Sequence, residues 1–159
     1  MLNPLEDLRG QIVDLLPRLR RFARTLARNP HDADDLVQIA VERALARSDQ
    51  LRPGARVSSW MFGILRHAWL DEARARGRRA RILVAGELGE NVGVEDAHAH
   101  GLSVETALAR LPEEQRAAIG LVLVEGLSYK EAAEILEIPI GTLTSRLARG
   151  REALQAMLE

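Results

Sequence analysis

The sequence predicts an all-α protein built as two small helical domains joined by a flexible linker. Good helix formers (Ala, Leu, Arg and Glu) dominate the composition, and runs of β-branched residues are scarce. Apolar residues recur at helical spacing along most of the chain. One stretch, residues 84–102, lacks this period and separates the two periodic parts. Apolar residues make up 47% of the 159 residues, which is enough to form real cores.

The N-terminal domain, residues 1–83, should hold three helices. The first is expected over residues 5–28 and ends before Asn29 and Pro30. The second should begin near Asp32, which we expect to be its N-cap, and run to about residue 47. The third should follow a loop that holds a proline and a glycine, and should span about residues 58–79.

The segment 84–102 is predicted to be the linker. It contains four glycines, several acidic residues and no Lys or Arg. The alternative is a long loop within a single domain, but structureless loops of this length are uncommon in compact domains. His98 and His100 also lie here, and a loose pair of histidines in such a segment is usually incidental rather than a metal site.

The C-terminal domain, residues 103–159, should hold four helices. The first carries an apolar stripe from Val104 to Leu111. Pro112 marks the start of the next helix, which should reach about Glu125 and stop at Gly126.

The last two helices form a pair with a short break at Pro139 and Gly141. Ser128 and Glu131 have the spacing of a capping box at the start of the first. Its apolar stripe comprises Tyr129, Ala132, Ala133 and Leu136, and the second helix buries Leu143, Leu147 and Leu154.

The opposite face of the second helix is suited to DNA, since it carries short hydroxyls followed by arginines, at Thr142, Ser145, Arg146 and Arg149. Hydroxyls and arginines contact base edges and phosphates in a major groove, so the pair is predicted to be a helix-turn-helix. The alternative is an ordinary solvated surface. Lys130 is the one lysine among the 22 basic residues, so the chain favours arginine over lysine throughout, and arginines on one helix face need not indicate DNA binding.

Composition argues against several other classes. The chain has no Cys, and therefore no disulfide, thiolate metal site or cysteine nucleophile. It shows no apolar run near 18 residues and no signal-peptide pattern, so we expect no membrane insertion. No phosphate-binding glycine loop is present, and Asp71 with Glu72 among arginines indicates charge pairing rather than catalysis. We expect neither an enzyme nor a cofactor or metal.

Three segments, in order, resemble the extracytoplasmic-function (ECF) sigma factors of bacterial RNA polymerase. The segment RRFARTLARNPHDADDLVQIAVERAL, residues 20–45, resembles the opening of the family's region two. The segment SSWMFGILRHAWLDEARARGRR, residues 58–79, resembles the part that melts and reads the −10 promoter element. The segment LPEEQRAAIGLVLVEGLSYKEAAEILEIPIGTLTSRLARGREAL, residues 111–154, resembles region four, which reads the −35 element. The segments DADDLVQ and LPEEQR are most similar to the corresponding segments of the general-stress-response group.

The resemblance implies partners and roles. The partners are core RNA polymerase (its clamp and flap), promoter DNA and an anti-sigma factor, all in the cytoplasm. The residues implied in docking on the core polymerase are Asp35, Leu36, Gln38 and Glu42. Most relatives carry Glu at the next position after Gln38, where this chain has Ile39.

The implied −10 contacts lie in the third helix and are Trp60, Arg66, His67, Arg74, Arg78 and Arg79. Aromatic rings and arginine planes can stack an unpaired base, whereas the later arginines suit phosphates. Trp60 and Trp69 are the two tryptophans of this helix, and the alternative for each is a place in the core. His67 stands where relatives usually show Asn.

The implied −35 contacts lie in the helix-turn-helix and are Lys130, Thr142, Thr144, Ser145, Arg146, Arg149 and Arg151. Relatives often have Lys where this chain has Thr144. We assign Arg146 first to a base edge and Arg149 to phosphate.

Two other functions compete with the sigma factor. A sigma-like decoy would bind an anti-sigma factor without any DNA contact. A free-standing helix-turn-helix regulator would leave the N-terminal two-thirds of the chain unexplained.

Overall fold

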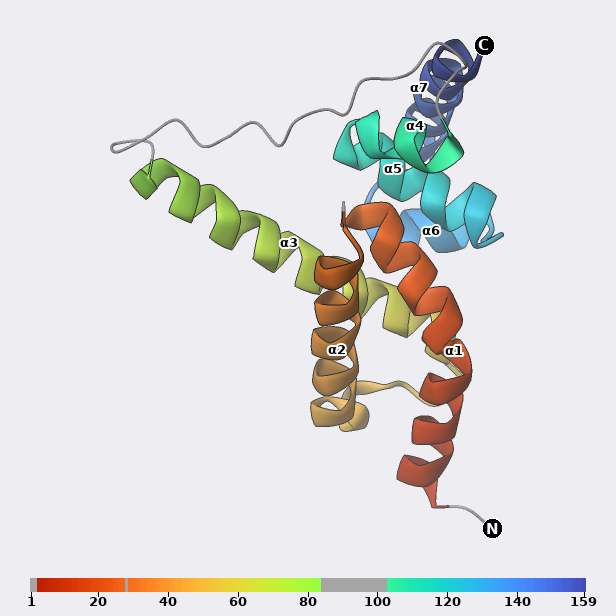
Figure 1. Ribbon diagram of the computed structural model, residues 1–159. Helices are drawn as coiled ribbons and strands as arrows, with labels where there is room; N and C mark the ends of the chain where they lie inside the picture. Colours follow the sequence, from red (N-terminus) through yellow and green to blue (C-terminus); the bar gives the residue numbers. More distant parts are fainter. Residues whose placement is uncertain (1–2, 28, 84–102) are drawn as a thin grey trace.

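The structure, a computed structural model, describes residues 3–27, 29–83 and 103–159, and helices fill most of them. Figure 1 shows two groups of helices in contact with each other. The first group contains α1, α2 and α3, and the second contains α4 to α7 with the short π-helical segment η2. The predicted linker, residues 84–102, and its two histidines lie outside the described residues.

The first group is a three-helix bundle of α1 (Pro4–Leu26), α2 (Pro30–Ala46) and α3 (Val57–Leu83). A 3-10 turn, η1 (Ser48–Gln50), follows α2. Phe22 of α1 and Phe62 of α3 are fully buried and lie edge to face, with ring centroids 5.5 Å apart. Figure 1 shows the C-terminal half of α3 leaving the bundle and projecting away from it.

The second group packs α7 (Ile140–Leu158) against α4 (Val104–Arg110), α5 (Glu113–Ile119) and α6 (Tyr129–Leu136). Gly150 permits the close approach of α7 and α5, because a β-carbon at this position would lie 2.4 Å from Cδ1 of Ile119. Leu143 and Leu147 are buried on the inner face of α7, and Leu154 is half-buried, in agreement with the apolar stripe.

The all-α fold is confirmed, and three local predictions need correction. Asn29, not Asp32, is the N-cap of α2: its side-chain oxygen accepts from the Asp32 amide at 2.8 Å, and Pro30 opens the helix. The helix after Pro112 does not stay α-helical to Glu125, because the hydrogen bonding widens into η2 (Gly120–Val124). Tyr129 is 41% exposed and does not share the buried stripe of α6.

The two groups also share an interface, with α1 against α5 and η2, and α3 against α6. Buried residues of both groups form one contiguous apolar cluster. The main chain of Gly120 lies against Phe22 and Thr25 of α1, where there is no room for a side chain. The two helical groups are therefore in close contact in this conformation.

Candidate nucleic-acid interface

The helix-turn-helix is formed by α6, a tight turn and α7. Ser128 caps α6 by accepting from the Glu131 amide at 3.1 Å, as its place before the apolar stripe predicts. Glu137 ends α6 in the left-handed conformation, with φ of 56°, which turns the chain sharply toward Pro139 and α7. The predicted helix-turn-helix is therefore present, with α7 as its second helix.

Most of the implied −35 contacts on α7 are open to solvent. Thr144, Ser145, Arg149 and Arg151 are exposed, and Thr142 is half-buried. The hydroxyls of Thr144 and Ser145 donate back to the carbonyls of Ile140 and Gly141, so their oxygens remain as acceptors for a ligand.

Arg146 differs from its neighbours on α7. Its side chain is 23% exposed, and its Nη2 lies 3.7 Å from a carboxylate oxygen of Glu114 on α5. Arg146 also lines a pocket of about 430 Å³, together with Arg66 and Trp69 of α3.

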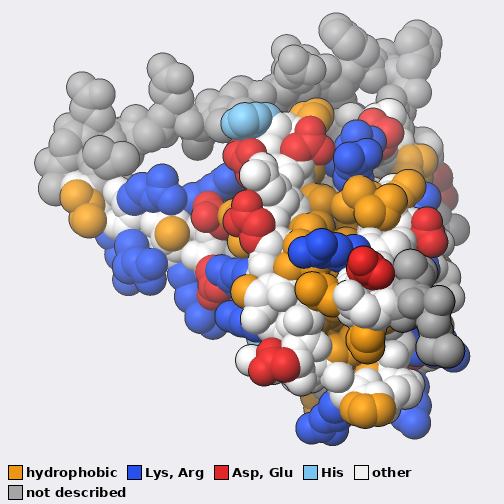
Figure 2. All heavy atoms as spheres, turned by 90° about the horizontal axis from the view of Figure 1, so that it is seen from below, with side chains coloured by type: hydrophobic (Ala, Val, Ile, Leu, Met, Phe, Trp, Pro, Cys, Tyr) orange, Lys and Arg blue, Asp and Glu red, His pale blue; other side chains and the backbone are white. Residues whose placement is uncertain are grey.

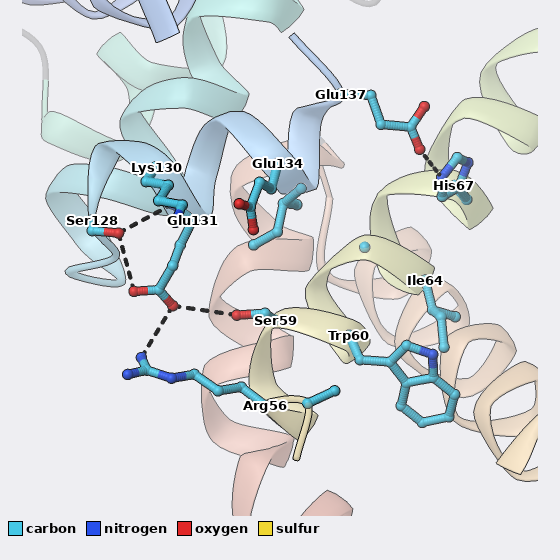
Figure 3. A pocket seen from close by; sticks show the side chains of 13 residues that line it. Arg56, Ser59, Trp60, Ile64, His67, Ser128, Lys130, Glu131, Glu134 and Glu137 are labelled. Carbon is cyan, nitrogen blue, oxygen red and sulfur yellow. Dashed lines mark hydrogen bonds and ion pairs between the residues drawn. The ribbon is translucent and has the colours of Figure 1, made fainter. Parts of the chain in front are cut away.

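Lys130 does not join the α7 face. It lies exposed at the start of α6 and lines a groove of about 770 Å³ between α6 and the N-terminal half of α3. Trp60 and His67 line the same groove, which Figure 3 shows from close by.

The implied −10 residues divide into two sets along α3. Trp60, Arg66 and His67 lie on the half that faces the second helical group, and Nε2 of His67 lies 2.8 Å from Oε1 of Glu137. Arg74, Arg78 and Arg79 are exposed on the projecting half, where Figure 2 shows basic side chains gathered.

Trp69 belongs to the core, which was the alternative considered for it. It is 8% exposed, and its indole Nε1 donates to Oε1 of Glu113 at 2.7 Å. Trp60 is half-buried at the groove, so its ring keeps one accessible part.

The implied polymerase-docking residues lie along α2. Asp35, Gln38 and Glu42 are exposed, whereas Leu36 is 2% exposed and packs beneath them in the core. Near them, a hydrogen bond from Asn29 and the paired guanidinium of Arg76 lower the pKa of Asp32 below its ordinary value, so Asp32 stays ionised. The face is thus polar at its rim and supported from below by Leu36.

Acidic residues of the second group contact basic and polar residues of the first. Glu125 forms ion pairs with Arg18 and Arg21, and the hydrogen bond that Arg21 donates to Glu125 raises the pKa of Arg21. Glu131 meets Arg56 and Ser59, as the dashed lines in Figure 3 show. Burial raises the pKa of Glu131, but hydrogen bonds from Ser128 and Ser59 and the charge of Arg56 outweigh it, so the net pKa is lowered.

The sequence reasoning did not identify these glutamates as functional residues. Each lies near a helix end or on a polar helix face, where an acidic residue ordinarily indicates solvent exposure. Their partners lie on other helices up to 107 positions away, so no local pattern could have identified them.

Two further searches concern the described residues only. Within residues 3–27, 29–83 and 103–159, no helix is long and apolar enough to cross a membrane. Over the same residues, no group of three His, Cys, Asp or Glu side chains is arranged to hold a metal ion.

Comparison with known families matches both helical groups. Sigma-70 region 2 matches residues 12–79, and Sigma-70, region 4 matches residues 101–154. The chain is 40% identical to the ECF RNA polymerase sigma factor EcfG of Rhodopseudomonas palustris, over 98% of this chain and 87% of the relative. It is 38% identical to the ECF RNA polymerase sigma factor SigM of Mycobacterium tuberculosis, over 89% and 71% of the two chains.

Among solved structures, the chain resembles the sigma factor RpoE in its co-crystal structure with the anti-sigma factor NepR from Bartonella quintana. The TM-score is 0.83, with 35% identity, and the match covers 96% of this chain and 97% of that chain. Both regions, their order and the fold agree, and the chain belongs to the family of ECF sigma factors of bacterial RNA polymerase.

Proposed function

We propose that this chain binds core RNA polymerase in the cytoplasm and directs it to promoters through two DNA-reading surfaces. Each part of the chain has its own role. Residues 1–83 dock on the polymerase and read the −10 element. Residues 84–102 connect the two domains, and residues 103–159 read the −35 element. The observation that supports this most strongly is the presence of regions 2 and 4, in order, in a chain 40% identical to EcfG over nearly its whole length.

The exposed acidic and amide side chains on α2 are suited to the clamp of the polymerase. Asp35, Gln38 and Glu42 point outward over the buried Leu36, which gives a polar patch on a rigid helix. Ile39 is half-buried beside them and would add apolar contact where relatives carry a charge.

The −10 role falls on α3. Trp60 and His67 offer rings, and Arg66 a planar cation, for stacking an unpaired base at about 1–3 kcal/mol each. The arginines at the projecting end, Arg74, Arg78 and Arg79, suit the phosphates beside the melted strand.

The −35 role falls on α7. Thr142, Thr144 and Ser145 lie in its first two turns, which is the part of a recognition helix that reaches base edges. Arg146 suits a base edge, whereas Arg149 and Arg151 suit phosphates, and Lys130 on α6 adds positive charge at the margin.

We also propose regulation by an anti-sigma factor. The Bartonella quintana relative was solved in complex with the anti-sigma factor NepR, and this chain matches it over 96% of its length. The sequences of the DADDLVQ and LPEEQR segments support a role in the general stress response.

Transcript mapping tests the function. The purified chain is incubated with sigma-free bacterial core polymerase and genomic DNA, and transcript starts are mapped with and without it. We expect new starts that share one pair of upstream elements. No new starts, although binding to a matched core is demonstrated, would refute promoter direction and favour the decoy.

A further inference from the structure

We propose that Arg76 is a positioning residue, which fixes the direction of the DNA-reading end of α3 relative to the polymerase-docking face of α2. It acts through Asp32 and Trp69 and makes no DNA contact of its own. Its effect on the direction of α3 can be measured in the free chain, whereas its effect on promoter binding rests on the proposed function.

Arg76 stands in the arginine-rich end of α3, yet its side chain contacts other groups of the protein. Its Nη2 lies 2.8 Å from Oδ2 of Asp32, in the first turn of α2. Its guanidinium also lies over the ring of Trp69, 6.0 Å from the centroid, where the face of an indole attracts a cation. Within the described part of α3, the other arginines of this end form no ion pair or ring contact: Arg74, Arg78, Arg79 and Arg81.

Asp32 is itself held in place. The side-chain amide of Asn29 donates to Oδ2 of Asp32 at 2.7 Å, and the backbone amide of Asp32 donates back to Oδ1 of Asn29 at 2.8 Å. Its position in the first turn of α2 also favours a negative charge, because the N-terminal end of a helix is partly positive. Asp32 therefore connects Arg76 to the capped beginning of α2.

The pair of Asp32 and Arg76 is the last such connection along α3. Arg43 and Asp71 form an earlier ion pair between the same two helices, at 2.8 Å. Beyond Arg76, the described residues of α3 form no ion pair and are exposed, and Figure 1 shows this part of the helix projecting away from the bundle. A helix end with few packed contacts moves readily, so its direction depends on the last contact that it makes.

The same residues adjoin the docking face. A hollow of about 260 Å³ between α2 and α3 is lined by Asp32, Trp69 and Arg76 together with the implied docking residues Asp35, Leu36, Gln38 and Glu42. The contact that directs the end of α3 thus lies beside the residues assigned to the polymerase. Since the polymerase holds α2, Arg76 determines where the following arginines lie relative to the bound DNA.

The competing role for Arg76 is a phosphate contact of the kind assigned to its neighbours. The two roles differ in their dependence on salt. Loss of one phosphate contact lowers the slope of log affinity against log salt by about 1, because one fewer counterion is released. Loss of a residue that only positions the helix weakens binding and leaves this slope as it is.

The first experiment measures the direction of α3 in the free chain. The chain has no native Cys, so Asp34→Cys and Ala80→Cys give two exposed sites for nitroxide labels, one on α2 and one near the end of α3. We expect one narrow distance distribution in the parent chain and a broader one in both Arg76→Gln and Asp32→Asn. Arg78→Gln, the matched control, should leave the distribution unchanged. Far-UV circular dichroism checks that each variant keeps its helix content.

The second experiment measures promoter binding by holoenzyme assembled at saturating chain concentration, over a series of salt concentrations. Arg76→Gln and Asp32→Asn should each weaken binding about two- to fivefold, the range expected for a partly exposed ion pair, with the salt slope of the parent. The double variant should be no weaker than either single one, because both remove the same pair. Arg78→Gln should lower the slope by about 1.

Three results would overturn the positioning role of Arg76. They are an unchanged distance distribution in both Arg76→Gln and Asp32→Asn, a slope lowered by about 1 in Arg76→Gln, and losses in promoter binding that multiply in the double variant. Failure of the proposed function gives a different result. The parent holoenzyme would then bind no promoter, while the distance distributions would still show whether Arg76 directs α3.

Discussion

Arg21 and Glu125 are 104 positions apart in the sequence, yet Nε of Arg21 donates to Oε2 of Glu125 across 2.7 Å. Arg21 belongs to the sigma-70 region 2 match and Glu125 to the region 4 match, so this bond joins the two DNA-reading regions directly. The conformation in which it forms is closed, because the same interface brings Arg66 and Arg146 to one pocket.

The two arginines at Glu125 should act as a unit. Arg18→Ala or Arg21→Ala alone leaves one partner for the buried carboxylate and should lower the free energy of unfolding by about 1 kcal/mol. Arg18→Ala with Arg21→Ala leaves the carboxylate unpaired and should cost about 3–5 kcal/mol unless the groups separate. Urea denaturation measures the cycle, with exposed Arg20→Ala as a control within about 0.5 kcal/mol of the parent. Additive single changes would contradict shared pairing.

Arg146 and Arg149 should differ in sequence dependence. Arg146→Ala should weaken binding of the holoenzyme at a cognate promoter by about 1–3 kcal/mol and relax the preference at one −35 position. Arg149→Ala should weaken binding to all sequences alike and reduce the salt dependence. Competition binding over a library of −35 variants separates the two. Uniform loss for Arg146→Ala would reassign it to phosphate.

The turn of the helix-turn-helix should tolerate glycine better than alanine at position 137. Glu137 has φ of 56°, which strains any residue with a β-carbon. Both Glu137→Gly and Glu137→Ala lose the pair with His67, so they differ only in backbone freedom. The glycine variant should be more stable by about 0.5–1 kcal/mol, after its greater freedom in the unfolded chain is allowed for. Thermal unfolding of the two variants side by side gives this difference, and an equal or lower stability for glycine would argue against the strained turn.

The contact between α5 and α7 should fail when Gly150 gains a side chain. Gly150→Ala places a β-carbon 2.4 Å from Cδ1 of the buried Ile119, and overpacking of this kind costs about 1–3 kcal/mol. Ile119→Val removes that methyl group and by itself should cost about 0.5–1.5 kcal/mol. The double variant should be less destabilised than the sum of the two single variants in urea denaturation. Simple additivity would show that the two positions do not meet.

Much of the fold follows from local pattern. The apolar stripes of α6 and α7, the Ser128 cap and the proline before α7 specify the helix-turn-helix with signals only a few residues long. Helix boundaries are harder to predict where two sequence signals compete. Asn29 and Asp32 are both good N-caps, and Pro30, which suits the first helical position, decides in favour of Asn29.

The interface between the two groups could not be predicted in this way. The closeness of Gly120 to Thr25 and the burial of Glu125 depend on how whole helices pack, and Glu125 reaches α1 from the end of a π-helical turn that no periodicity indicated. Arg66 and Arg146 were assigned separate DNA elements on sequence grounds. Only the packing of α3 against the second group reveals that they line one pocket.

The most direct test follows the distance between dyes attached at Asp49→Cys and Ala156→Cys, one exposed position in each helical group of a chain without native Cys. The distance is measured in the free chain, then with core polymerase, and then with promoter DNA. We predict a short distance for the free chain and a single, much longer one in the holoenzyme, retained when promoter DNA is bound. An unchanged short distance in a holoenzyme that initiates transcription would contradict the account, because the two DNA-reading regions would then be working while closed.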